Sequence, residues 1–147
     1  MKEVKAILLI IVVLLLAGLG YFVLLKNKPL QEQVQPPTIL EPRVNDEGGL
    51  SIEATPVDFS FSTPVKLKID FTTHQGDLKF DLTKISYLLD DKNNKYVPAS
   101  WDGGSGGHHL SGTLYFSEPI KDAKTIKFVI ENVYNVEKRA FIWEIKQ

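Results

Sequence analysis

From Leu50 onward, apolar and polar residues alternate along the chain in short runs. Successive side chains of a β-strand point to opposite faces of the sheet, so this alternation predicts strands with one buried face. Residues that favour turns separate the runs. The runs are "IEATPVDFSF" (52–61), "VKLKIDF" (65–71), "ISYLL" (85–89), "KYVPAS" (95–100), "LSGTLYF" (110–116), "IKFVI" (126–130) and "FIWEI" (141–145).

About seven short strands with this spacing, and no helical period among them, predict an all-β domain over 50–147. The count and the spacing are typical of an antiparallel β-sandwich of immunoglobulin-like type. The alternation also predicts which residues face the space between the two sheets. They are Phe59, Phe61, Val65, Leu67, Ile69, Phe71, Ile85, Tyr87, Leu89, Leu110, Gly112, Leu114, Phe116, Ile126, Phe128, Ile130, Phe141, Trp143 and Ile145.

A run of twenty residues without a charge, "AILLIIVVLLLAGLGYFVLL" at 6–25, precedes this domain. A helix rises about 1.5 Å per residue, so the run is long enough for the roughly 30 Å apolar core of a bilayer. It is too long for the apolar region of a cleaved signal peptide, and no small-x-small cleavage site follows, which favours an uncleaved signal anchor. We therefore expect a cytoplasmic head at 1–5 and a single-pass protein of the cell membrane. Its C-terminal domain would lie outside the cytoplasm.

The segment 26–49 joins the expected membrane helix to the expected domain. It contains four prolines and several glutamines, and it closes with two glycines. Neither a helical nor a strand period runs through it. This composition predicts a flexible, partly extended linker.

Charge and cysteine content limit the classes of function. The formal net charge is -1 at pH 7, whereas a nucleic-acid-binding domain normally carries a clustered basic surface. The chain contains no cysteine, which excludes disulfides, thiolate metal sites and cysteine nucleophiles. We expect no nucleic-acid partner. The expected partners are the membrane, through 6–25, and a protein or small ligand outside the cytoplasm.

Residues suited to binding or catalysis concentrate in "SWDGGSGGHHLSG" (100–112). This stretch holds five of the ten glycines and one of the two tryptophans of the chain. All three histidines lie here or in "TTHQGDL" (72–78), namely His74, His108 and His109. The loop from Trp101 to His109, together with His74, is therefore the candidate site.

These two segments are similar to paired T-H-x-x-D-L and W-D-G…G-G-H-H motifs in small immunoglobulin-like ectodomains of prokaryotic membrane-anchored proteins. The stretch "ISYLLDDKNNKYVP", followed by "SGTLYFSEP", also resembles these ectodomains, and the resemblance covers about 65–133. It implies an extracytoplasmic immunoglobulin-like fold, and no established activity comes with it. The chain departs from the pattern at Leu110, where a basic residue is expected after the histidine pair.

The first hypothesis is a binding module without enzymatic activity. Trp101 would supply an aromatic platform, with Asp102 and His109 as polar partners, as carbohydrate and peptide sites often do. His108 and His74 complete this set. A purely structural interpretation stays open, in which Trp101 covers the core and a histidine fixes the loop by hydrogen bonds.

The second hypothesis is a site for Cu(II) or Zn(II), because imidazole is the commonest metal ligand. Alternation in the strand puts His109 on the outer face, which it would share with His74. A bulge at the glycines would exchange His109 for His108. Asp77 and Asp102 are the candidate carboxylate ligands.

Two further candidates are weaker. "GGSGG" (103–107) matches G-x-S-x-G, but the strand–turn–helix that a hydrolase nucleophile needs is not predicted, so a hydrolase is a remote alternative. Asp90 and Asp91 precede "KNNK" without the closing glutamate of a calcium loop. We interpret them as part of a solvated hairpin turn.

Overall fold

The computed structural model describes Tyr21 and residues 38–145. The domain formed by 38–145 contains nine strands and one short helix. The strands are β1 (Arg43–Glu47), β2 (Leu50–Pro56), β3 (Lys66–Thr73), β4 (Ser86–Asp90), β5 (Lys95–Tyr96), β6 (Pro98–Trp101), β7 (His109–Phe116), β8 (Thr125–Val133) and β9 (Val136–Glu144). The helix α2 (Leu82–Ile85) comes directly before β4.

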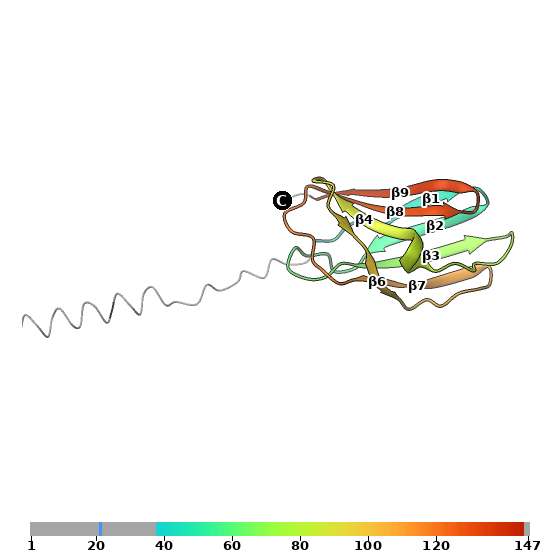
Figure 1. The fold of residues 1–147 in the computed structure, drawn as a ribbon, viewed down its shortest axis with the longest axis horizontal. Helices are drawn as coiled ribbons and strands as arrows, with labels where there is room; N and C mark the ends of the chain where they lie inside the picture. Colours follow the sequence, from blue (N-terminus) through green and yellow to red (C-terminus); the bar gives the residue numbers. More distant parts are fainter. Residues whose placement is uncertain (1–20, 22–37, 146–147) are drawn as a thin grey trace, which may run out of the picture. The chain divides into compact units, whose positions relative to one another are not determined.

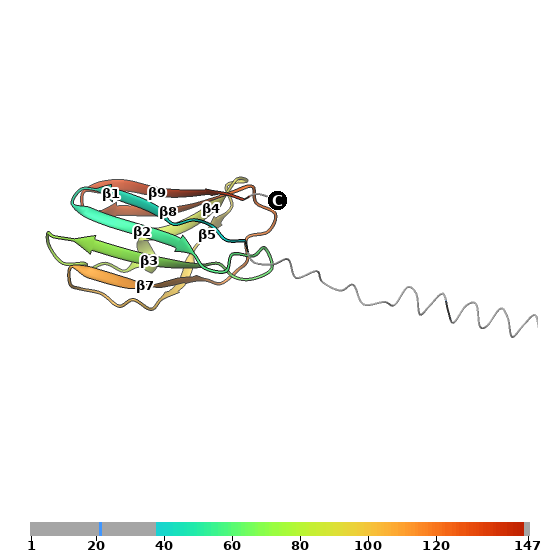
Figure 2. The same ribbon diagram turned by 180° about the vertical axis from the view of Figure 1, so that it is seen from behind.

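The strands form two antiparallel sheets that face each other (Figures 1 and 2). The first sheet has the order β1-β2-β3-β7-β6, and the second has the order β5-β4-β8-β9. The chain crosses between the sheets at Val97, between β5 and β6. The prediction of an all-β domain is confirmed.

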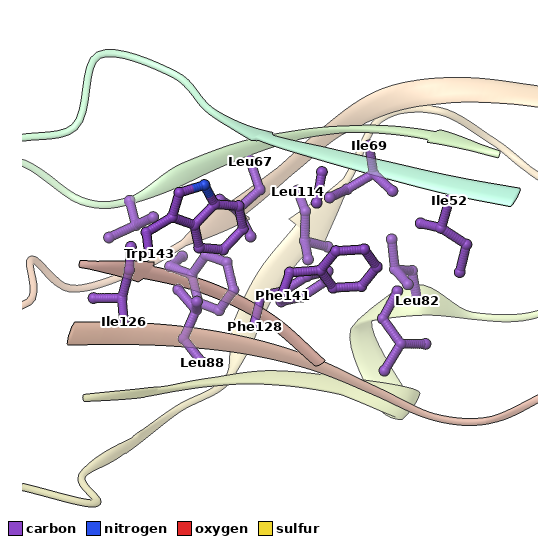
Figure 3. Packing of buried hydrophobic residues seen from close by; sticks show 14 of the residues in the cluster. Ile52, Leu67, Ile69, Leu82, Leu88, Leu114, Ile126, Phe128, Phe141 and Trp143 are labelled. Atoms are coloured by element: carbon purple, nitrogen blue, oxygen red, sulfur yellow. The ribbon is translucent and has the colours of Figure 1, made fainter. Parts of the chain in front are cut away.

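The hydrophobic core lies between the two sheets, as Figure 3 shows. Alternation correctly predicted the inward faces of β3, β7, β8 and β9, where side chains such as Leu67, Leu114, Phe128 and Trp143 are buried. Each such side chain contributes about 1.5–3 kcal/mol relative to an exposed one. The helix α2 adds Leu82 to the same core.

The predicted inward face of β4 is wrong. Ile85, Tyr87 and Leu89 are only half-buried, whereas Ser86, Leu88 and Asp90 face the core. Polar groups can occupy buried positions when they are hydrogen-bonded. The Ser86 hydroxyl donates to the Leu82 carbonyl at 2.6 Å, and the Asp90 carboxylate accepts bonds from its own turn. The expected solvated turn is therefore organised around a buried carboxylate.

Two predicted strands have different limits in the structure. "IEATPVDFSF" ends as a strand at Pro56, because Asp58 takes a positive φ of 49° and turns the chain. "KYVPAS" divides at Val97 into β5 and β6, which belong to different sheets.

The expected linker over 26–49 is wrong in its last part, because Arg43–Glu47 forms strand β1. Leu40 is buried in the core, and the Trp143 indole donates from Nε1 to the Glu41 carbonyl at 2.6 Å. The domain therefore begins before residue 50. The first part of the domain contacts β9, which is distant in the sequence. A local pattern of hydrophobic residues therefore does not reveal that this part is folded.

The expected head at 1–5, the rest of the linker at 26–37 and the expected membrane helix at 6–25, apart from Tyr21, lie outside the described residues. Within the described residues, no helix has both the length and the apolar character needed to cross a bilayer.

The connections between strands gather at two opposite ends of the domain (Figure 1). At one end, here called the entry end, the described chain begins, and Thr38 pairs with Phe59 of the β2–β3 connection. The β4–β5 turn and the β7–β8 connection meet there too, because the Lys124 N–H donates to Asp91 at 2.8 Å. The other end, the loop end, carries the β1–β2 turn, the β3–α2 connection and the β8–β9 turn. Residues 106–108 lie there too, because the Thr73 N–H at the end of β3 donates to the His108 carbonyl.

Candidate binding site beside the glycine-rich loop

The two motif segments of the sequence lie against each other in the structure. The Thr73 N–H donates to the His108 carbonyl at 2.9 Å, and the Leu78 N–H donates to the Gly107 carbonyl at 3.1 Å. In return, the Gly106 N–H donates to the Leu78 carbonyl at 2.8 Å. The pairing of β3 with β7 is thus continued by backbone hydrogen bonds beyond the ends of the two strands.

Two glycines allow the segment after β6 to fold closely against β7. A Cβ at Gly112 would overlap the backbone of Gly103, and a Cβ at Gly103 would overlap the Trp101 ring. Gly106 and Gly107 have φ values of 96° and 82°, a region that side chains with a Cβ rarely adopt. The glycine content of this stretch therefore has a structural cause.

Trp101 packs against the core from the edge of the first sheet. It lies opposite Leu114 of β7, which is buried, so the two side chains share the inner face of the sheet. Its ring contacts the Phe71 ring edge-to-face, with 6.3 Å between centroids. The indole N–H donates to the Gly104 carbonyl at 2.8 Å, and the residue stays half-buried. Trp101 thus both covers the core and exposes part of its ring.

Asp102 fastens the loop to β7. One carboxylate oxygen accepts the Thr113 N–H at 2.5 Å, and the other accepts the Tyr115 hydroxyl at 3.0 Å. Both oxygens are therefore engaged within the domain. Asp102 therefore holds the loop in place, and it is not part of the lining of the hollow described below.

The three histidines are all exposed. His109 begins β7 opposite Thr72, and its Nδ1 lies 3.3 Å from the Thr72 hydroxyl. His109 therefore lies on the outer face of the sheet, opposite to the face on which Trp101 packs. His74 and His108 lie at the loop end. The residues expected to form one surface are thus divided between the two faces of the sheet.

The hypothesis of a Cu(II) or Zn(II) site gains no support. Among the described residues, no group of three His, Asp or Glu side chains is arranged so that it could hold a metal ion. Asp77, one of the expected ligands, binds Lys79 at 2.7 Å and the Gly107 N–H at 2.6 Å. The Lys79 ammonium, followed by the Gly107 N–H, lowers the pKa of this carboxyl from its usual value.

A shallow hollow of about 460 Å³ lies beside Trp101. Its lining consists of Lys79, Phe80, Asp81, Trp101, Gly104 and Ser105. Phe80 was not among the residues selected from the sequence. Its ring packs edge-to-face on Phe71 with 5.2 Å between centroids, so the buried Phe71 ring supports both aromatic residues of the hollow.

The charged groups of the hollow are already paired. Lys79 binds Asp77, as described, and Asp81 binds Lys84 at 3.0 Å. Asp81 also accepts the Thr83 hydroxyl at 2.6 Å and the Thr83 N–H at the start of α2. The hydroxyl and Lys84 lower the pKa of Asp81 from its usual value. The hollow is therefore electrically balanced.

Ser105, the serine of the G-x-S-x-G match, is exposed on the rim of the hollow. No hydrogen bond joins its hydroxyl to a histidine ring within the described part of the chain. The geometry gives no specific support to the hydrolase hypothesis.

No known protein family, curated protein or solved structure matches this chain. The function is accordingly inferred from the geometry of the domain.

Proposed function

We propose that this protein is a single-pass membrane protein whose immunoglobulin-like domain binds a partner or ligand outside the cytoplasm. The uncharged run at 6–25 supports the membrane anchor, since its length suits a bilayer. The domain would then stand on the outer side of the membrane.

The strand order supports an immunoglobulin-like fold. In such folds, strands A, B, E and D form one sheet in the order ABED, and C, F and G form the other, with C′ added in variable-type domains. Here β2-β3-β7-β6 takes the order ABED, and β5-β4-β8-β9 takes the order C′CFG. β1 is an additional strand at the edge of the first sheet.

The observation that carries the binding function is the position of two loops, which correspond to the B–C and F–G loops of an immunoglobulin domain. In variable-type immunoglobulin domains, the B–C and F–G loops at one end form the binding surface. The corresponding connections here lie at the loop end, opposite the end where Thr38 pairs with Phe59. The loop end is therefore the part of the domain most available to a partner.

The loops at this end are also held in one arrangement by hydrogen bonds between them. The Tyr134 hydroxyl donates to the Gln75 carbonyl at 2.7 Å, which joins the β8–β9 turn to the β3–α2 connection. The Thr73 hydroxyl donates to the Gly49 carbonyl at 2.7 Å and adds the β1–β2 turn. A surface ordered in advance loses less conformational entropy on binding.

Site-specific photo-crosslinking in cells tests this function. A photoreactive amino acid replaces His74 at the loop end, Ser105 at the hollow or Ser117 at the entry end of the full chain. All three residues are exposed. We expect a discrete crosslinked product from position 74 or 105 and none from position 117. Products from position 117 alone, the same products from all three positions, or no product at all would contradict the proposal.

A further inference from the structure

We infer that the hollow beside Trp101 is a subsite for a neutral saccharide ring, an inference that rests on the binding function proposed above. It assigns a ligand class to the surface formed by Lys79, Phe80, Asp81, Trp101, Gly104 and Ser105, here called the aromatic hollow. Four features of this surface carry the inference.

The first feature is a pair of half-exposed aromatic rings in fixed positions. Phe80 and Trp101 both pack edge-to-face on Phe71, which is 1% exposed. The indole N–H of Trp101 is already bonded to Gly104, so the ring offers its apolar surface to a ligand. The apolar C–H face of a sugar ring matches such a surface, and ligand sites are commonly lined in this way.

The second feature is the set of polar groups around these rings. Asp81 is an acceptor, the Lys79 ammonium is a donor and the Ser105 hydroxyl is both. All three residues are exposed at the rim. A ligand with hydroxyl groups around an apolar ring could bond to donors and acceptors together, which a purely apolar ligand could not.

The third feature is the balance of charge. Lys79 is paired with Asp77 and Asp81 with Lys84, so the hollow carries no excess of either sign. A single-sign surface would steer an oppositely charged ligand by long-range attraction. The balanced hollow therefore favours a neutral saccharide over an acidic one or a phosphate.

The fourth feature concerns β6, the strand next to the hollow. Extended peptides commonly bind by adding a strand to an exposed sheet edge. β6 has four residues, begins with Pro98 and shows a register shift between Pro98 and Ser100. Proline removes a backbone donor and bulges interrupt pairing. This edge is therefore poorly suited to an added strand, which favours a saccharide over a peptide.

Fluorescence quenching of the full chain tests the inference, in a detergent whose headgroup is not a sugar. Trp143 is 1% exposed, so acrylamide reaches chiefly Trp101. The neutral probes are chitotetraose, cellotetraose and maltotetraose, and the comparison probes are tetragalacturonate and a proline-rich decapeptide. We expect at least one neutral oligosaccharide to protect Trp101 from quenching in a saturable manner, and tetragalacturonate to give no protection.

Ser105→Arg should fill the hollow, and Ser117→Arg at the entry end is the matched control. We expect Ser105→Arg to weaken the protecting saccharide by about tenfold or more, equivalent to roughly 1.4 kcal/mol, with an unchanged Tm. The control should bind like the parent chain. The inference is overturned if no neutral probe protects Trp101, if both variants bind alike, or if only the acidic probe or the peptide protects.

The crosslinking and quenching experiments together distinguish failure of this inference from failure of the proposed function. If a product forms from position 74 or 105 while no neutral saccharide binds, the ligand class is wrong and the binding function stands. If no product forms from position 74 or 105 and no neutral saccharide binds, both are wrong.

Discussion

Asp90 is a buried carboxylate that organises the turn after β4. Its oxygens accept the Lys92 N–H at 2.9 Å, the Asn94 N–H at 2.8 Å and the Asn94 side-chain amide at 2.7 Å. The Tyr96 hydroxyl adds a longer bond at 3.2 Å. Burial alone would raise the pKa of this carboxyl, but the hydrogen bonds from Asn94, Lys92 and Tyr96 outweigh burial and lower it.

A lowered pKa makes the contribution of Asp90 to stability depend on pH. It is fully present above the pKa of an unfolded aspartate, about 3.9, and is lost as the pH falls through the lower folded value. We expect Asp90→Asn to destabilise the domain at pH 7 by about 1–3 kcal/mol, because Asn94 and Tyr96 each lose an acceptor.

Chemical denaturation of the full chain at pH 7 and near pH 3 measures this effect. The difference between the parent and Asp90→Asn should shrink at the lower pH. A difference that stays constant or grows in acid would show that the charge of Asp90 has no part in its contribution.

A substitution at Gly112 tests how closely the segment after β6 packs against β7. Gly112→Ala should destabilise the domain by about 1–3 kcal/mol, the usual cost of overpacking, because the new Cβ would overlap the Gly103 backbone. Thr113→Ala, on the outer face of the same strand, is the control and should change stability much less. Equal thermal unfolding of the two variants would contradict the packing described for this loop.

Single residues also show where a sequence pattern is sufficient and where it fails. Alternation predicted core positions of β3, β7, β8 and β9 because most of their inward residues are apolar, Thr73 and Arg139 being the buried polar exceptions. It failed for β4 because Ser86 and Asp90 face inward and find hydrogen-bond partners close by. Whether a polar residue has such partners depends on the folded turn, which a pattern of hydrophobicity does not contain.

Among the elements, β1 depends on contacts with strands distant in the sequence. The Arg139 side chain of β9 is 1% exposed, and it donates from Nη1 to the Asn45 side chain and from Nη2 to the Glu47 carbonyl at 2.9 Å. Burial lowers the pKa of this guanidinium, while Glu47 and Asp46 oppose the shift. Arg43 adds a bond from Nε to the Ile142 carbonyl at 2.9 Å. These bonds join the edges of the two sheets.

Arg139→Met should therefore destabilise the domain strongly. Removal of a buried donor costs about 1–3 kcal/mol for each acceptor left without a partner, and Arg139 contacts several. Lys138→Met is the matched control, since Lys138 makes an exposed ion pair with Glu131 at 3.3 Å. Such pairs contribute about 0–1 kcal/mol.

Thermal unfolding of the full chain followed by circular dichroism compares the two variants. A Tm of Arg139→Met close to that of Lys138→Met would show that Arg139 does not hold the two sheet edges together. The need for such distant contacts also explains why "RVNDE" was predicted to be part of a linker. Its residues have no apolar alternation, and four of the five are exposed.

For the whole molecule, the sequence drew attention to residues 100–112 but did not reveal the hollow beside Trp101. Trp101 and the glycines are unusual in the sequence, and the structure gives them closely packed positions. Phe80 was missed because only the folded chain brings it to the same buried ring as Trp101. His109 was included, although the register of β7 places it on the outer face.

The proposed arrangement requires a domain outside the cytoplasm with a partner at its loop end. Because the chain contains no cysteine, His74→Cys and Ser117→Cys each introduce a single thiol, at the loop end and at the entry end. A membrane-impermeant maleimide is applied to intact cells and, separately, to the purified full chain.

We predict that both thiols react on intact cells and that only the one at position 74 reacts more slowly there than in the purified chain. Reaction only after lysis would place the domain inside the cell. Equal protection at both ends, or none at position 74, would contradict a binding surface at the loop end.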